Sequence, residues 1–261
     1  MSSAFWDAVV PDEEVDRDDE ALNRELRWRE LRRHLDGVRT ILDVGGGTGA
    51  FSIPLAQEGY AVTHLDVSPA MLAAARAKSA LPTYVEGDAA DLPFADASFD
   101  LVLNTDGAIS FAGDASSRVL AETCRVGRKV FVTVSHRATM TATWLKYSLR
   151  ATGRVLPAVG EMLRTGRWDA AQFPENALLF PSVCDVPRLK AFTHAELVAA
   201  LEANGMTVLA ARPLGSLGQL MLPHGIAAAS VDMAELAEEL DAMFDGPGSY
   251  RRAGLLAVGQ R

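Results

Sequence analysis

The sequence has few of the features that mark secreted, membrane-spanning or metal-binding proteins. Its 261 residues include only two cysteines, Cys124 and Cys184, which are too few for a disulfide framework or a cysteine-rich metal site. No run of about 18 apolar residues is present, so we expect no membrane-spanning helix. The first residues carry neither a basic stretch nor an apolar core, so we expect no signal peptide. We therefore expect reduced thiols, a cytoplasmic location and no bound metal.

Positive charge is also scarce. The net charge is −9, which argues against non-specific binding to nucleic acid or to an anionic membrane. The acidity is concentrated, because residues 7–20 hold eight acids and one arginine while all other residues together sum to −2. Residues 137–170 are locally basic, with six arginines and lysines against two acids. One hypothesis from this division is that the acidic segment closes over the basic one around a substrate.

What the sequence does contain is an alternation of strand-like and helix-like apolar segments. Hydrophobic residues make up 49% of the chain and charged residues 23%, as in ordinary globular proteins. Strands joined by helices of this length predict a doubly wound, mostly parallel α/β sheet with right-handed crossovers. The predicted strands of this alternation are 40–44, 61–65, 83–86, 99–104 and 129–135.

A glycine-rich turn follows the first predicted strand. It reads Asp43-Val-Gly45-Gly-Gly47-Thr-Gly49 and leads into a predicted helix. Glycines allow a sharp turn and a close approach of ligand to backbone, and the helix N-terminus offers unpaired N–H groups to an anion. Asp43 offers a carboxylate to a cation. A ligand that carries both an ammonium and a carboxylate, such as an amino-acid tail, fits this pair of poles.

Two further acids follow the next two predicted strands. Asp66 ends the second strand, where a carboxylate accepts hydrogen bonds from ribose hydroxyls in many nucleotide sites. Asp88 follows the third strand, and together with the N–H of Ala89 it matches the donor and acceptor edge of adenine. Because the carboxyl ends of parallel strands meet at one edge of the sheet, these acids predict a ligand site there.

At this point the sequence resembles the class I S-adenosylmethionine-dependent methyltransferases. The segments ILDVGGGTG, LDVSPAMLAAA, EGDAADLPF and SFDLVLN occur in the order and spacing of that family. The resemblance covers about residues 38–136 well and the C-terminal part loosely. It implies a Rossmann-like sheet of seven strands in which the last strand is inserted antiparallel. One departure is Arg125-Val-Gly127-Arg-Lys129, where the family often has a Pro-Gly-Gly turn; this position is remote from the site.

The resemblance also implies a set of residues that bind S-adenosylmethionine. The glycine turn with its acid would hold the methionine end, the second acid the ribose, and the third acid with the following amide the adenine. Met71 would pack on the adenine face, and the residues that end the fourth strand would lie near the sulfonium. The implied set is Asp43, Gly45, Gly47, Gly49, Asp66, Val67, Met71, Asp88, Ala89, Asn104 and Thr105.

The predicted elements divide the chain into four segments. The first begins with an acidic arm, expected to be mobile up to residue 20, in which Phe5 and Trp6 are candidates for docking on the rest of the protein. The last contains a helix that Thr193 and Glu196 cap reciprocally, then an antiparallel pair of strands at 206–211 and 255–258 with an acidic helix between them at 231–244. The segments are 1–37, the arm and a cover helix; 38–136, the cofactor-binding half; 137–190, an insertion of helices and loops that forms a substrate lid; and 191–261, which completes the same domain.

A sulfonium donor already carries a good leaving group. The enzyme's main task is therefore to hold the acceptor in line with the methyl group and to exclude water. An amine acceptor needs little more, whereas a hydroxyl or phenol usually needs a base, for which His136 and Asp106 are the candidate catalytic residues. We expect transfer to N or O, with C ranked behind. Residues 137–190, with two tryptophans and many aliphatics, are expected to form the pocket for a small, partly apolar or aromatic acceptor.

Two alternatives remain open at this point. A nicotinamide-dependent reductase on a similar sheet would want a Tyr-x-x-x-Lys pair, but Tyr147 is followed four residues later by Ala151. A non-catalytic regulatory protein that keeps the cofactor pocket would share the motifs. We expect a small-molecule substrate and no nucleic-acid or membrane partner, because the chain has no basic stripe and reads Asn104-Thr-Asp-Gly where amino-methylating nucleic-acid enzymes have Asn/Asp-Pro-Pro-aromatic. Monomer and homodimer are both open.

Overall fold

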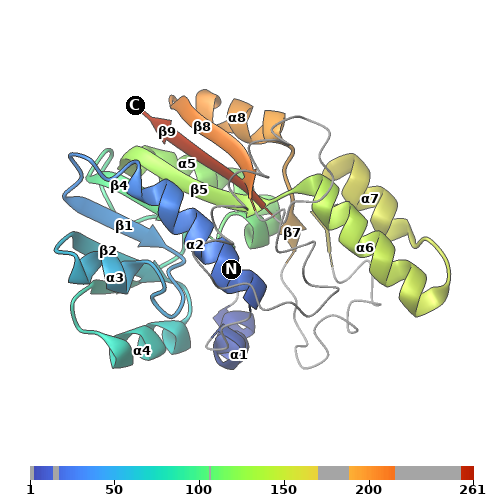
Figure 1. Ribbon diagram of the computed structural model, residues 1–261, viewed down its shortest axis with the longest axis horizontal. Helices are drawn as coiled ribbons and strands as arrows, with labels where there is room; N and C mark the ends of the chain where they lie inside the picture. The colour runs from blue at the N-terminus through green and yellow to red at the C-terminus, as the bar shows by residue number, and fades with distance from the viewer. Residues whose placement is uncertain (1–2, 14–17, 106, 170–187, 215–253) are drawn as a thin grey trace.

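A seven-stranded sheet forms the centre of the molecule (Figure 1). The computed structural model describes residues 3–13, 18–105, 107–169, 188–214 and 254–261. The strands run in the order β3-β2-β1-β4-β5-β9-β8, of which the first five are mutually parallel and β9 is antiparallel to both of its neighbours. Their bounds are β1 Thr40–Val44, β2 Ala61–Asp66, β3 Thr83–Glu86, β4 Phe99–Asn104, β5 Gly127–Ser135, β8 Thr207–Leu214 and β9 Gly254–Gln260. The predicted doubly wound, mostly parallel sheet is confirmed.

Helices cover both faces of this sheet (Figure 1). Side chains of α5 and α8 pack on one face, and side chains of α2 and α3 pack on the other. Burial of both faces of the sheet explains the consecutive apolar residues in β4. Val102 faces one helical layer, whereas Leu101 and Leu103 face the other. The helices are α1 Ser3–Glu13, α2 Asp18–Arg32, α3 Ser52–Gln57, α4 Pro69–Lys78, α5 Ser116–Val126, α6 Arg137–Thr152, α7 Pro157–Thr165 and α8 His194–Ala203, with a 3-10 turn η1 Ser110–Ala115.

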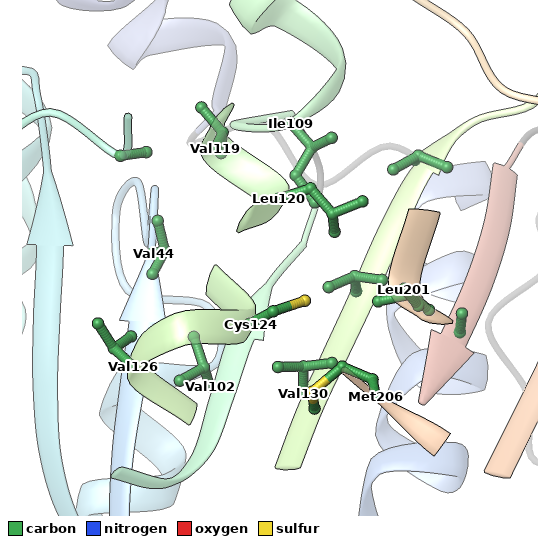
Figure 2. Close-up of a cluster of buried hydrophobic side chains, with 14 of the residues drawn as sticks. Val44, Val102, Ile109, Val119, Leu120, Cys124, Val126, Val130, Leu201 and Met206 are labelled. Carbon is green, nitrogen blue, oxygen red and sulfur yellow. The ribbon is translucent and has the colours of Figure 1, made fainter. Parts of the chain in front are cut away.

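The larger core cluster lies between the sheet and helices α5 and α8 (Figure 2). Leu120 and Cys124, one helical turn apart on α5, meet Val130 of β5 and Leu201 of α8 in this cluster. Burial raises the pKa of the Cys124 thiol to about 12, so it stays protonated and unreactive. Cys184 lies outside the described residues.

The N-terminal segment differs from the expectation of a mobile arm. Residues 3–13 form helix α1, and Phe5 is buried in a small cluster with Met71 of α4. Asp7 accepts hydrogen bonds from the Ser68 hydroxyl and the Ala70 amide. The expectation of mobility does not hold for residues 3–13, where the apolar residues Phe5 and Trp6, named as candidates for docking, pack against α4. Helix α2 then crosses the sheet (Figure 1).

The insertion after β5 is built from helices α6 and α7, which form a hairpin at the end of the molecule away from α4 (Figure 1). Trp144 of α6 stacks on Trp168, with ring centroids 5.0 Å apart. A two-stranded antiparallel pair, β6 Arg167–Trp168 and β7 Leu189–Lys190, closes the cluster and was not predicted. No helix in the described part of the chain combines the length and the apolar character that crossing a membrane requires. The predicted helix at 231–244 lies outside the described residues.

Candidate functional site

A cavity of about 720 Å³ opens where strands β1, β2 and β4 end. This is the edge at which open α/β sheets bind their ligands. Nine of the eleven residues that the sequence predicted for a cofactor line this one cavity. They are Asp43, Gly45, Gly47, Gly49, Asp66, Val67, Met71, Ala89 and Thr105. Asp88 and Asn104 are not among the lining residues.

The glycine turn forms one wall of the cavity. Gly45, Gly47 and Gly49 all have left-handed backbone, with φ of 69°, 55° and 93°. Side chains rarely adopt this conformation, so the turn requires glycine. A Cβ on Gly45 would also lie only 2.8 Å from the Cβ of Ala108. The turn is tied to the sheet because the Gly45 amide donates to the Leu65 carbonyl at 2.7 Å. The backbone is therefore fixed at the distance a ligand needs for close approach.

Asp43 is the most unusual group in the cavity. Its carboxyl is almost fully buried, at 1% exposure, and its Oδ2 atom has no hydrogen-bond partner. Burial, and secondly the charge of Asp66, raise the pKa of Asp43 to about 7. A buried carboxylate oxygen without a donor is costly to keep. Its position beside the cavity suits a ligand that brings a cation.

Asp66 is held by backbone amides on both oxygens. Its Oδ2 accepts from the Gly47 amide and its Oδ1 from the Ser68 amide, each at 2.9 Å. Each carboxylate oxygen has a second lone pair, so both can still accept a ligand hydroxyl. Burial raises the pKa of Asp66. Ser68 also caps α4 by accepting from the Met71 amide at 3.1 Å.

The far end of the cavity is apolar. Met71 and Ala89 line it and are both nearly fully buried. The Asp88 carboxylate turns back to accept from the Ala90 amide at 2.9 Å. Asn104 donates to the Thr123 hydroxyl of α5 at 2.9 Å, on the opposite side of the sheet from the cavity-lining Thr105. Successive residues of a strand point to opposite faces, which explains why only one of these neighbours reaches the cavity.

Sequence reasoning missed the residues that the N-terminal helices bring to the cavity. Trp6 of α1 and Arg24 and Arg27 of α2 line it, together with Lys78 of α4. Lys78 donates to the Thr48 carbonyl at 3.1 Å. Helix α2 was expected as a cover, but its sequence does not reveal which arginines face inward. Three cations beside the glycine turn give this wall a positive potential that suits an anionic ligand group.

Of the two predicted catalytic residues, the structure describes His136 but not Asp106. His136 follows β5 and begins α6, where its Nδ1 is 3.2 Å from the Thr139 hydroxyl. It does not line the cavity described above. Asp106 lies outside the described residues, between Thr105 and Gly107, which both line the cavity. Among the residues that the structure describes, no group of three or more His, Cys, Asp or Glu side chains is arranged to hold a metal ion.

Comparison with known proteins identifies methyltransferases of similar sequence. A model of the methyltransferase domain matches residues 42–130. Demethylmenaquinone methyltransferase of Renibacterium salmoninarum is 33% identical over 166 residues, which cover 60% of this chain and 68% of that enzyme. Malonyl-(acyl-carrier protein) O-methyltransferase of Pectobacterium atrosepticum is 42% identical over 88 residues, which cover 34% of each chain, so the match spans about a third of that relative.

The whole fold also has solved counterparts. The crystal structure of an S-adenosylmethionine-dependent methyltransferase from Mesorhizobium loti superposes with a TM-score of 0.62 and 22% sequence identity. The similarity covers 90% of this chain and 98% of that one. The similarity in fold therefore extends beyond the glycine-turn half.

Proposed function

The chain belongs to the family of S-adenosylmethionine-dependent methyltransferases, and from that premise we propose that it methylates an N or O atom of a small, partly apolar or aromatic metabolite. In this proposal, methylation of carbon ranks behind these two. The observation that carries the proposal is the unpartnered Oδ2 of Asp43, buried beside a glycine turn in a nucleoside-sized cavity. A cytoplasmic location stays a prediction of the sequence.

The residues of the cavity fit S-adenosylmethionine from end to end. Asp43 would accept from the ammonium group, and the guanidinium groups of Arg24 and Arg27 would attract the carboxylate. The two free lone pairs of Asp66 would accept from the ribose hydroxyls. The remaining predicted contacts, through Met71, Ala89 and the Asp88 carboxyl, would enclose the adenine. When bound, this cofactor supplies an activated methyl group.

The chain's own contribution is to position the acceptor and exclude water. Trp6 lines the cavity from α1 and packs edge-on against Phe111 of η1, with centroids 5.5 Å apart. Phe111 in turn packs against the aromatic cluster of the insertion. We infer that Trp6 lies between the cofactor cavity and the acceptor pocket. Holding both reactants in one water-poor site accounts for most of the rate gain that such a transfer needs.

The acceptor pocket is placed by this proposal beneath the insertion. Trp144, Met162 and Trp168 form its buried apolar cluster, which suits an apolar or aromatic acceptor. The relatives' names mention a demethylmenaquinone and a malonyl-(acyl-carrier protein), and both describe acceptors that are not nucleic acid. For a hydroxyl acceptor, His136 or Asp106 would remove the proton. Alanine variants of both that keep wild-type turnover would exclude that role.

Two measurements test the proposed function. Calorimetry should show binding of S-adenosylmethionine and S-adenosylhomocysteine, and no binding of NADH or NADPH, the ligands of the reductase alternative. A methyl-transfer assay over a panel of amines, phenols and carboxylic acids should then find an acceptor. Cofactor binding without transfer to any member of a broad panel would favour the non-catalytic alternative.

A further inference from the structure

His64 is a buried polar residue that none of the roles above uses. It lies on β2 with 0% exposure, between Thr63 and Leu65. Burial lowers the pKa of His64 to about 4, so the ring is neutral at physiological pH. A buried imidazole costs free energy unless its nitrogens are satisfied. Its partners therefore indicate what it is for.

These partners lead directly to the cofactor cavity. The Nδ1 atom of His64 is 2.7 Å from the Ser52 hydroxyl oxygen at the start of α3. Ser52 also lies close to the Asp43 carboxyl, since its hydroxyl and its amide both act to lower the pKa of Asp43. His64 and Asp43 are themselves paired across β2 and β1. The three side chains thus form a continuous line from β2 through α3 to β1.

The packing around Gly46, the middle glycine of the turn, also places His64 next to Asp43. A Cβ on Gly46 would lie 2.5 Å from the His64 ring and 3.0 Å from Oδ2 of Asp43. Gly46 does not have left-handed backbone, so its own conformation does not require glycine. What requires glycine here is the close packing of the turn on His64 and Asp43. The turn, the imidazole and the carboxylate are therefore one packed unit.

One arrangement of the Ser52 and His64 protons suits an ionised Asp43. An ionised Asp43 only accepts, so in this arrangement the single hydroxyl proton of Ser52 turns toward the carboxylate. Ser52 then has only lone pairs to offer His64. The Nδ1 atom must carry the imidazole proton and donate it to Ser52, which leaves Nε2 without a proton. Consistent with this assignment, Nε2 is buried and has no hydrogen-bond partner.

We propose that His64 is a positioning residue for the amino-acid end of the cofactor, acting through Ser52 to orient the Asp43 carboxylate. This inference rests on the proposed cofactor. The other charged or titratable groups near the line are Asp66, whose charge acts to raise the pKa of Asp43, and Arg76, whose charge acts to lower that of His64. Tyr84 of β3 lies against the imidazole, with ring centroids 5.1 Å apart.

Two ligands separate this role from a merely structural one. S-adenosylhomocysteine has the amino-acid end, whereas 5′-methylthioadenosine is the same nucleoside without it. For His64→Phe and Ser52→Ala we expect the Kd of S-adenosylhomocysteine to rise roughly tenfold at pH 7.5, the size expected for a lost bond to a charged group. The Kd of 5′-methylthioadenosine should change less than about twofold. Calorimetry on the full chain measures both.

Two further variants are matched to these. His64→Asn keeps a donor close to the position of Nδ1 and should restore most of the affinity for S-adenosylhomocysteine. Tyr84→Phe removes a hydroxyl that bonds to the Ala75 and Ser79 carbonyls, next to the imidazole but outside the line, and should change neither affinity. Because Ser52→Ala removes a single oxygen atom, it tests the proposal even where His64→Phe does not fold.

The pH profile gives a second readout. Affinity of the wild type for S-adenosylhomocysteine should fall as pH drops below about 7, because Asp43 then takes up a proton. In Ser52→Ala the midpoint should move to higher pH, since the hydrogen bond that lowers the pKa of Asp43 is gone. Equal weakening of both ligands, or no weakening of either, would overturn the proposal. Wild type that binds neither ligand would refute the proposed function itself, and this inference with it.

Discussion

The glycine-turn half and the α6–α7 hairpin differ in which groups line their surfaces: hydrogen-bonded polar groups and backbone in the first, exposed aliphatic side chains in the second. Around the turn, backbone amides hold Asp66 on both oxygens and the backbone adopts conformations that only glycine tolerates. On the hairpin, aliphatic side chains remain exposed: Leu145, Leu149, Val155 and Leu163 are four of the six large exposed hydrophobics in the described residues. The difference indicates that the proposed cofactor site combines a fixed backbone with a few buried charged side chains, whereas the proposed acceptor side presents apolar side chains.

The sharpest test of this difference is Asp43→Asn. It removes a charge-assisted bond to the ammonium group, so the Kd of S-adenosylhomocysteine should rise roughly 30- to 100-fold, with the affinity for 5′-methylthioadenosine retained. Calorimetry measures both values. An unchanged affinity for S-adenosylhomocysteine would show that the buried carboxylate does not recognise the ligand.

The same variant has a predicted effect on stability. The pKa of Asp43 rises from 3.8 to about 7 on folding, so the unfolded chain ionises first as the pH rises. The free energy of unfolding of the cofactor-free protein should therefore decrease between about pH 4 and about pH 7. Asp43→Asn should flatten that decrease. Urea titrations at several pH values measure it, and identical profiles for the two proteins would contradict the prediction.

The two regions also offer a matched pair of glycines. Gly45 and Gly153 have nearly equal φ, 69° and 68°, but a Cβ would lie 2.8 Å from Ala108 at Gly45 and meet nothing within 4 Å at Gly153. Alanine at either position should cost about 1 kcal/mol for the left-handed backbone. Gly45→Ala should cost about 1–3 kcal/mol more for the overpacked contact. If urea titrations show that both variants lose the same free energy of unfolding, the backbone around Gly45 relaxes enough to accommodate the extra Cβ.

The smallest expected effect is on the acceptor side. Trp168→Phe shortens one member of the stacked pair in the insertion, which is remote from the glycine turn. Once an acceptor is known, its KM should rise roughly fivefold because the apolar wall changes shape. The Kd of S-adenosylhomocysteine should stay within about twofold of the wild-type value. A large rise in the Kd of S-adenosylhomocysteine in Trp168→Phe would contradict the assignment of cofactor binding and acceptor binding to separate regions.

Much of the cofactor half was predictable because its signals are local, such as the glycine turn after β1 and the acid that ends β2. The capping box of α8, formed by Thr193 and Glu196, was visible in the same way. Such motifs act within four residues, so they are visible without a fold. The antiparallel pairing of β9 with β8 was expected from the predicted strands, and the antiparallel insertion of the last strand from the family resemblance.

The parts that escaped prediction depend on contacts between distant segments. The inward orientation of Arg24 and Arg27, the docking of α1 on α4, and the line from His64 to Asp43 join residues that lie far apart in the chain. Hydrophobic periodicity carries no information about such partners. His64 shows this plainly, because in sequence nothing in β2 distinguishes it from the other polar residues of that strand.

The bond between Asp7 and Ser68 couples the first helix to the nucleoside site. Ser68 gives its hydroxyl proton to Asp7 and its amide proton to Asp66, so one residue touches both the docked helix and the proposed ribose acceptor. Coupling between two binding events is reciprocal in free energy. If docking of α1 raises the cofactor affinity by a given factor, bound cofactor raises the equilibrium constant for docking of α1 by the same factor. Occupancy of the site should therefore slow hydrogen exchange in residues 3–13, and the first turns of the chain would report from a distance whether the site is filled.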